Sequence, residues 1–201
     1  MANEIEAEPE GLTTRHRILQ IALSLMSQRG VDGTSMRDLA TASGLNVASL
    51  YHYFPSKREL LEAVLVERGY FPVRVHRPRP EEDESAEGQL AVLLITILES
   101  MFAVEDFVRL MTGEAMRGEV TARAVGLDLF TTFHATIEEW IVRHLPDLDQ
   151  RVGAPAVARM LGEMVVGIFV LHAAGVMGDE DGDITKIVTR RAREAAQILG
   201  V

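Results

Sequence analysis

The chain of 201 residues contains no cysteine, and aromatic residues make up only 5% of it. Without cysteine the chain can form neither disulfide bonds nor thiolate metal sites, which fits a reducing compartment. The sequence also lacks a glycine-rich phosphate loop, a cluster of metal ligands and a triad-like set of acid, base and nucleophile. These absences argue against an enzyme and against a bound metal or other cofactor.

The residues that are present favour helices. Hydrophobic residues make up 47% of the chain and charged residues 25%, which allows a substantial buried core. Alanine, leucine, methionine, arginine and glutamate are frequent, and no segment shows the alternation typical of a strand. We therefore predict an all-α protein.

No segment has the pattern of a leader peptide or of a membrane span. The start of the chain is acidic and lacks an apolar core, so it does not resemble a secretory signal peptide. The most apolar run, residues 164–178, is shorter than the roughly 20 residues that a span needs, and it contains His172. We expect a buried helix there, and a cytoplasmic protein without a membrane partner.

The net charge of −10 opposes binding to nucleic acid, but the charges are unevenly distributed. Residues 12–60 carry six basic and three acidic side chains, a net charge of +3. The acidic residues gather in the first eleven residues, at residues 81–84 and near residues 179–183. Any DNA binding must therefore come from a local basic face.

Composition predicts a division of the chain into four segments. Residues 1–11 are acidic and are expected to form a disordered tail. Residues 12–69 contain the short helices described below. Residues 70–85 contain three prolines and a run of charge, which is typical of a linker. Residues 86–201 show only helical periodicity and are expected to form a second, larger domain.

Local signals place four helices in the first domain. Thr13 or Thr14 is the expected N-cap of the first helix, which ends at Gly30. A second helix is expected over residues 36–43 and a third over residues 47–53, and Ser56 opens a fourth. Later helices are expected over residues 86–103, 105–117, 121–145, 155–177 and 184–199, the last of them capped by Asp183.

The second and third helices have the spacing of a helix-turn-helix. Ser35 and Asp38 form a capping box for the second helix, and Asn46 caps the third. Gly44 permits a left-handed turn between them, and Leu50 reaches back into the core. The second helix of such a motif enters the major groove of DNA, so this segment predicts a DNA-binding domain.

Small and polar side chains lie on this candidate recognition helix. Val47 and Ala48 suit contacts with thymine methyl groups, while Tyr51 and His52 suit phosphate oxygens. Alternatively, Tyr51 packs on the fourth helix and His52 is only solvated. The predicted DNA-binding residues are Ser35, Arg37, Asn46, Val47, Ala48, Ser49, Tyr51, His52 and Lys57.

Several short runs between residues 14 and 64 form a family pattern, namely Thr34-Ser35-Met36, Leu50-Tyr51, Tyr53-Phe54 and Ser56-Lys57. With these runs, the segment resembles the DNA-binding domain of TetR/AcrR-type transcriptional regulators. The resemblance covers about a quarter of the chain. It departs from the family at Val31, where an aromatic residue is usual, and at Asn46, where Ser or Thr is common.

The resemblance implies a homodimer of all-helical subunits that binds a palindromic, double-stranded DNA operator. It also implies a carboxy-terminal domain that binds a small molecule and sets the spacing of the two DNA-reading heads. Most members of the family are repressors. We therefore expect a ligand-responsive repressor that a small apolar or amphipathic effector of unknown identity releases from its operator.

The last two expected helices predict a dimer interface. Residues 164–174 are apolar nearly all round, so that helix needs cover on two sides, which a four-helix bundle with a second subunit supplies. The alternative is a helix buried within a monomer. The predicted dimerisation residues are Leu161, Val165, Ile168, His172, Ile187, Val188, Arg191, Ala195 and Ile198.

Large adaptable side chains in the second domain are candidates for an effector pocket. His134 suits the role of a polar anchor for the ligand. His134 and Glu138 together supply too few ligands for a metal site. The alternative for each of these side chains is ordinary core packing. The predicted ligand-binding residues are Phe102, Phe107, Met111, Phe130, Phe133, His134, Trp140 and Phe169.

Two other functions stay open at this point. A small helical enzyme or carrier would need a converging set of catalytic groups, which the sequence does not show. A DNA-binding activator, or a constitutive DNA-organising factor, would share the helix-turn-helix. The acidic second half of the chain argues against broad nonspecific coating of DNA.

Overall fold

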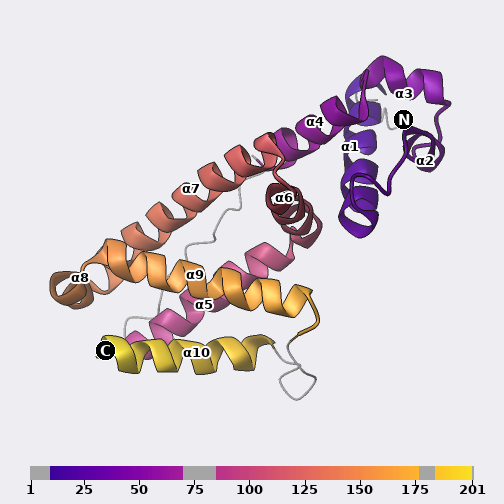
Figure 1. The fold of residues 1–201 in the computed structure, drawn as a ribbon. Coiled ribbons are helices and arrows are strands. Elements are labelled where there is room, and N and C mark those ends of the chain that lie inside the picture. Colours follow the sequence, from indigo (N-terminus) through magenta and orange to yellow (C-terminus); the bar gives the residue numbers. More distant parts are fainter. Residues whose placement is uncertain (1–9, 70–84, 177–183, 201) are drawn as a thin grey trace, which may run out of the picture. The chain divides into compact units, whose positions relative to one another are not determined.

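The computed structural model describes residues 10–69, 85–176 and 184–200, and the regular structure of these residues is entirely helical (Figure 1). The predicted all-α class is confirmed. Most of the predicted tail and linker, together with the predicted cap Asp183, lie outside the described residues. The helices are α1 (Glu10–Arg29), α2 (Met36–Ala42), α3 (Val47–Tyr53), α4 (Lys57–Gly69), α5 (Ala86–Phe102), α6 (Glu105–Arg117), α7 (Val120–His144), α8 (Pro146–Val152), α9 (Ala154–Ala173) and α10 (Ile184–Leu199).

Two expectations about helix boundaries are wrong. The first helix begins at Glu10, upstream of the predicted caps Thr13 and Thr14, so it includes the end of the predicted tail. In addition, no helix was expected where α8 lies, because Pro146 was expected only to end the helix before it. Proline fits the first turn of a helix equally well, and Pro146 opens α8.

The helices group into two compact units. The first unit contains α1 to α4 together with residues 106–126 of α6 and α7, and the second contains α5, the rest of α7, and α8 to α10. This grouping differs from the predicted division, which assigns every residue from 86 onward to one domain. Helical periodicity shows that a segment has an apolar face, but it does not show which neighbours cover that face.

The core of the first unit forms where α1 packs against α2 and α4. The apolar stripe predicted for α1 is buried, with Ile18 and Ala22 fully inaccessible. Burial of these side chains supplies the main stabilisation of such short helices, which are marginal in isolation. The core side chains of α4 are Leu60, Leu61, Val64 and Leu65.

A glycine in the left-handed region makes the turn between α2 and α3. Gly44 has φ of +68° and donates its N–H to Thr41 O at 3.1 Å, while the N–H of Leu45 donates to Ala40 O at 2.9 Å. These two bonds are the Schellman pattern that closes a helix at glycine. A side chain at Gly44 would meet no neighbour, so backbone conformation is the reason for glycine there.

One buried hydroxyl at this turn has no hydrogen-bond partner among the described residues. It is the Oγ of Ser43, the last residue before Gly44, and Ser43 is only 4% exposed. Burying a hydroxyl without a partner costs free energy. We therefore expect Ser43→Ala to raise the free energy of unfolding by up to about 1 kcal/mol. Urea denaturation measures this, and a loss of stability would show that the hydroxyl is satisfied in solution.

In the second unit, α5 lies between α9 and α10 and packs against both (Figure 1). Arg193 of α10 donates from Nε to Glu87 of α5 at 2.9 Å. Gly162 of α9 leaves room for the ring of His134 on α7, because a Cβ at this position would lie 2.5 Å from Nε2 of His134. The second unit is therefore a layered helical bundle whose two central helices, α5 and α9, are buried on their facing sides.

The helix α9 is long and apolar enough to cross a membrane by length and composition, and it is the one such helix among the described residues. In the monomer 44% of its most apolar window is buried. The core helix of a bundle has the same composition, so this feature is weak evidence for a span. Of residues 164–178, which were expected to form a buried helix, residues 164–173 belong to α9. Val165, Ile168 and Phe169 are buried, whereas Val170 and Leu171 are exposed.

Candidate nucleic-acid interface

Three exposed side chains form one face of α3. Ala48, Tyr51 and His52 are all exposed, with Tyr51 at 46%, and their spacing of three and four residues places them on the same side of the helix. The opposite side carries Leu50, which is 0% exposed, and the helix is closed by the buried ring of Phe54. The helix is thus anchored on one side and free on the other, as a recognition helix requires.

Polar caps fix where this helix begins. Asn46 Oδ1 accepts the N–H of Ser49 at 2.8 Å, which is the predicted N-cap. Both side chains were predicted to bind DNA. The structure gives Asn46 a capping role, leaves its amide nitrogen available, and places Ser49 half-buried at the edge of the exposed face.

The start of α2 carries the predicted capping box. Asp38 N–H donates to Ser35 Oγ at 3.1 Å, and Ser35 N–H donates to Asp38 Oδ2 at 3.0 Å. The hydroxyl of Ser35, then its N–H, and also Arg29 and Arg37, lower the pKa of Asp38. The charged carboxylate therefore stabilises the folded domain above its ordinary pKa of 3.8, and this contribution is lost as the pH falls through the lowered value.

Lys57 takes a different role from the predicted phosphate contact. Its ammonium group turns to the loop between α1 and α2 and donates to Val31 O at 2.8 Å and to Thr34 O at 3.2 Å. The fully buried hydroxyl of Thr34 in turn donates to Gly30 O at 2.9 Å. Lys57 therefore ties the start of α4 to this loop, and only one of its three N–H groups stays available for a phosphate.

Replacing Lys57 by methionine is therefore expected to destabilise the chain. Two carbonyls lose a charged donor, so the free energy of unfolding should fall by about 1–3 kcal/mol. Arg58→Met is the matched control, because Arg58 is exposed and pairs with Glu62 one turn later on α4, so the change should alter stability by less than about 0.5 kcal/mol. Urea denaturation compares the free energies of unfolding of the two variants. Equal effects would contradict a role for Lys57 in holding the loop between α1 and α2 to α4.

Arg15 is a supporting residue whose role the sequence analysis misses. Its guanidinium pairs through two nitrogens with the carboxylate of Glu67 on α4, and it lies over the ring of Phe54 at 5.1 Å from the centroid. The hydrogen bond with Glu67 raises the pKa of Arg15. Arg15 thus connects α1, α4 and the end of α3. No spacing in the sequence indicates this, because the partners are 52 residues apart.

The remaining predicted DNA-binding residue on α2 is free to reach outward. Arg37 is exposed, and Thr41, one turn later on α2, is also exposed, with its hydroxyl bonded to Arg37 O at 2.9 Å. An exposed arginine beside a recognition helix suits a phosphate contact, which fixes the register of a protein on DNA without reading sequence.

The predicted effector residues do not form one group. Phe107 and Met111 belong to the first unit, whereas the other six belong to the second. Trp140 and Phe169 are buried core. His134 lies with its ring 4.1 Å from that of Phe130, and its buried Nε2 has no hydrogen-bond partner among the described residues. Their role in ligand binding stays a prediction.

Six of the nine predicted dimerisation residues are not exposed on the surface of the subunit. These side chains are buried in the core of their own subunit, because the apolar stripe of each helix packs against α5 and its neighbours. They are Leu161, Val165, Ile168, Ile187, Val188 and Ala195. The other three, His172, Arg191 and Ile198, are exposed. The exposed apolar side chains of these helices include Val170 and Leu171.

Comparison with known proteins assigns the first unit to a family. Residues 18–64 match the model for bacterial regulatory proteins of the tetR family. The chain is similar to the transcriptional repressor KstR2 of Mycolicibacterium smegmatis, with 37% identity over 65 residues, 32% of this chain and 31% of that one. This match therefore spans about a third of the relative's length. The chain is also similar to the transcriptional regulator UidR of Escherichia coli, with 23% identity over 171 residues and 82% of each chain.

Solved structures share the fold over nearly the whole chain. Salmonella enterica GusR superposes with a TM-score of 0.67 at 23% identity, covering 99% of this chain and 100% of that one. A regulator described as putative from Saccharomonospora viridis, solved with choline, superposes with a TM-score of 0.70 at 19% identity, covering 92% and 96%. At such identities the likeness establishes the fold alone.

The anchored helix-turn-helix with an outward recognition face defines a DNA-binding transcriptional regulator, and the relatives are regulators and not enzymes. Residues 18–64 form a domain of the tetR family of bacterial regulatory proteins.

Proposed function

We propose that this regulator binds a palindromic operator as a homodimer in the cytoplasm, represses transcription, and is released by a small apolar or amphipathic effector. The observation that carries the proposal is the face of Ala48, Tyr51 and His52 on a helix whose opposite side is fully anchored. A rigid reading face is what sequence-specific contacts in the major groove need. Relatives whose names identify them as repressors, such as KstR2, support the direction of regulation.

The exposed faces of α9 and α10 support dimerisation. Val170 and Leu171 are exposed at 36% and 44%, and Ile198 of α10 is exposed at 78%. Large apolar side chains in such positions are typical of a surface that a second subunit covers. We therefore assign dimerisation to these outward residues with His172 and Arg191, in place of the buried stripe that periodicity indicates.

The unpartnered Nε2 of His134 supports an effector site in the second unit. A buried imidazole nitrogen without a partner is costly, and a ligand that supplies a hydrogen-bonding group would satisfy it. The neighbouring ring of Phe130 is partly exposed and suits an apolar or amphipathic molecule. This arrangement supports His134 as the polar anchor of the effector.

Selection of bound duplexes from random DNA, using the full chain, tests the DNA-binding part of the proposal. The enriched sequence is expected to be an inverted repeat, bound by two subunits in sedimentation experiments, with an affinity that falls steeply as salt rises. Absence of any enriched sequence would contradict the proposal. A reporter gene placed behind the enriched sequence then separates repression from activation, because repression predicts higher expression when the regulator is deleted.

Native mass spectrometry of the purified chain tests the effector. A retained small molecule is expected, and adding it back should release the selected operator in a mobility-shift assay. His134→Phe should weaken that release while leaving operator affinity without the molecule unchanged. A retained molecule that leaves the DNA complex intact would contradict the proposed regulation.

A further inference from the structure

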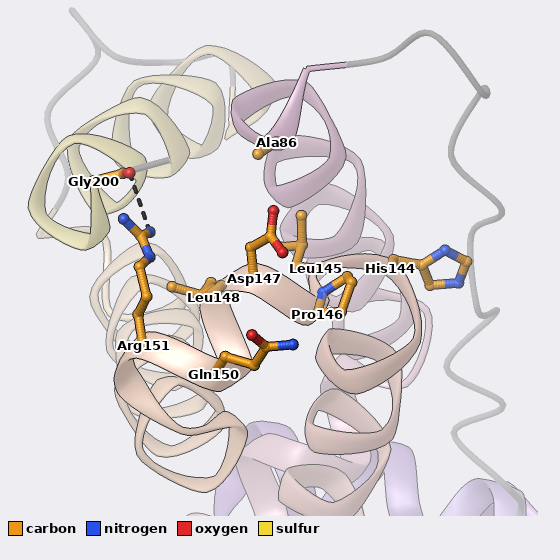
Figure 2. A pocket seen from close by; sticks show the side chains of 9 residues that line it. All are labelled: Ala86, His144, Leu145, Pro146, Asp147, Leu148, Gln150, Arg151 and Gly200. Atoms are coloured by element: carbon orange, nitrogen blue, oxygen red, sulfur yellow. Dashed lines mark hydrogen bonds between the residues drawn. The ribbon is translucent and has the colours of Figure 1, made fainter.

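A hollow of about 620 Å³ lies in the second unit, where the start of α5, the end of α7, α8 and the residue after α10 meet (Figure 2). Its volume falls within the range of about 300–1,000 Å³ that is usual for small-molecule sites. None of its lining residues belongs to the recognition face or to the predicted effector set. The proposed function therefore leaves this hollow without a role.

Arg151 forms one wall of the hollow and is held in place. Its Nη2 donates to Leu199 O at 3.0 Å and to Gly200 O at 3.1 Å, at the end of α10 (Figure 2). A cation at the carboxyl end of a helix is favoured by the helix dipole. These two bonds use the protons of one terminal nitrogen, so Nε and Nη1 keep N–H groups for another acceptor.

Asp147 carries the opposite charge and pairs with no other side chain of the wall. It lies one helical turn before Arg151, a spacing at which an aspartate and an arginine often pair, yet Arg151 is turned to α10 instead. In Figure 2 the carboxylate of Asp147 points from α8 towards the start of α5. Among the described residues it has no hydrogen-bond or ion-pair partner. The hollow thus holds one anionic and one cationic group that are not paired with each other.

The floor between these charges is apolar. Leu145 and Leu148 are buried, and Pro146 lies beside them facing the hollow (Figure 2). These apolar walls offer a surface on which an apolar side chain can pack. Asp147 and Arg151 are themselves exposed, so water partly screens their pairing with a ligand.

We propose that this hollow binds a free α-amino acid with an apolar side chain. The ammonium group of the ligand pairs with Asp147, its carboxylate accepts from the free N–H groups of Arg151, and its side chain packs on Leu145 and Pro146. A zwitterion matches both charged groups at once, whereas a molecule of one charge leaves the other group unmatched. The site is independent of the recognition helix and of the proposed effector.

Titration of the full, ¹⁵N-labelled chain with L-leucine tests this proposal. The backbone amide of Gly200 and the side-chain amide of Gln150, which also line the hollow, are expected to show saturable chemical-shift changes. Isopentylamine lacks the carboxylate and 4-methylpentanoate lacks the ammonium group, so each should bind about tenfold more weakly, through loss of one charge-assisted contact. Equal binding of the three probes, or no saturable change with L-leucine, would overturn the proposal.

A matched pair of variants tests the assignment of Asp147. Asp147→Asn is expected to weaken L-leucine binding about tenfold. Asp128→Asn removes the same charge from an exposed position on α7 outside the hollow and should leave the affinity unchanged. Unchanged binding by folded Asp147→Asn would overturn the proposal. The comparison of the three probes uses the unaltered chain, so it decides the question even where the variant fails to fold.

Discussion

The operator affinity of the Ala48→Glu variant is expected to fall at least about a hundredfold, while its free energy of unfolding changes by less than about 0.5 kcal/mol. Ala48 lies on the exposed face of α3, so a carboxylate there would be pressed against the phosphates and base edges of DNA. Juxtaposed like charges cost several kcal/mol. Glutamate is a good helix former, so the fold itself should be little affected.

Ala135→Glu is the control for this substitution. Ala135 is an exposed alanine in the middle of α7, and the change adds the same charge to a chain whose net charge is already −10. Operator affinity should therefore stay within about twofold of the unaltered chain if the local face decides binding. Fluorescence anisotropy with the selected operator measures both variants, and an equal loss in the two would mean that overall charge, and not α3, controls affinity.

The Leu50→Ala variant should lose about 2–5 kcal/mol of its free energy of unfolding. Leu50 is fully buried and is the one buried side chain of the seven-residue helix α3. Truncation removes its transfer free energy and leaves a cavity that a short helix between two tight turns cannot close by moving. Operator affinity should fall as well, because the recognition face loses its anchor.

The same chemical change at an exposed site provides the control. Leu127 of α7 is 68% exposed, so Leu127→Ala should alter the free energy of unfolding by less than about 0.5 kcal/mol. Denaturant titrations followed by circular dichroism compare the two variants. A small effect at Leu50 would mean that α3 is not held by the core of the first unit, and the assignment of the recognition face would fail with it.

Much of the first unit follows from the sequence because its determinants are local. The caps Ser35 and Asn46, the glycine at Gly44 and the proline after Phe54 each act within about four residues of their own position. The bounds of α3 agree with its predicted range, residues 47–53. Leu50 and Phe54 are buried as expected, and Tyr51 is exposed and not packed away on α4.

Contacts between distant residues explain what the sequence analysis misses. The ammonium of Lys57 bonds to carbonyls 23 and 26 residues away, and no side-chain pattern marks a backbone acceptor in a loop. A lysine in the first turn of a helix suggests an anion site by itself. Only the position of the loop between α1 and α2 shows that its charge is already engaged.

The predicted dimerisation residues of α9 also show that sequence patterns do not indicate contacts between distant helices. Its periodicity identifies Leu161, Val165 and Ile168 as one apolar stripe, and that stripe is the one that the subunit buries in its own core. Val170 falls outside the stripe, and both Val170 and Leu171 are exposed. A helix that is apolar all round gives no local signal of which side its own subunit covers.

For this chain, the order of amino acids by itself determined the all-helical class and the helix-turn-helix, because periodicity, caps and a left-handed glycine act over one or two turns of backbone. The tertiary structure alone decided the clamp of Lys57, the support of Arg15, the outward faces of α9 and α10, and the hollow between Asp147 and Arg151. Each of these depends on which distant helices come to lie together, and that is settled by burial across the whole unit and not by neighbours in sequence.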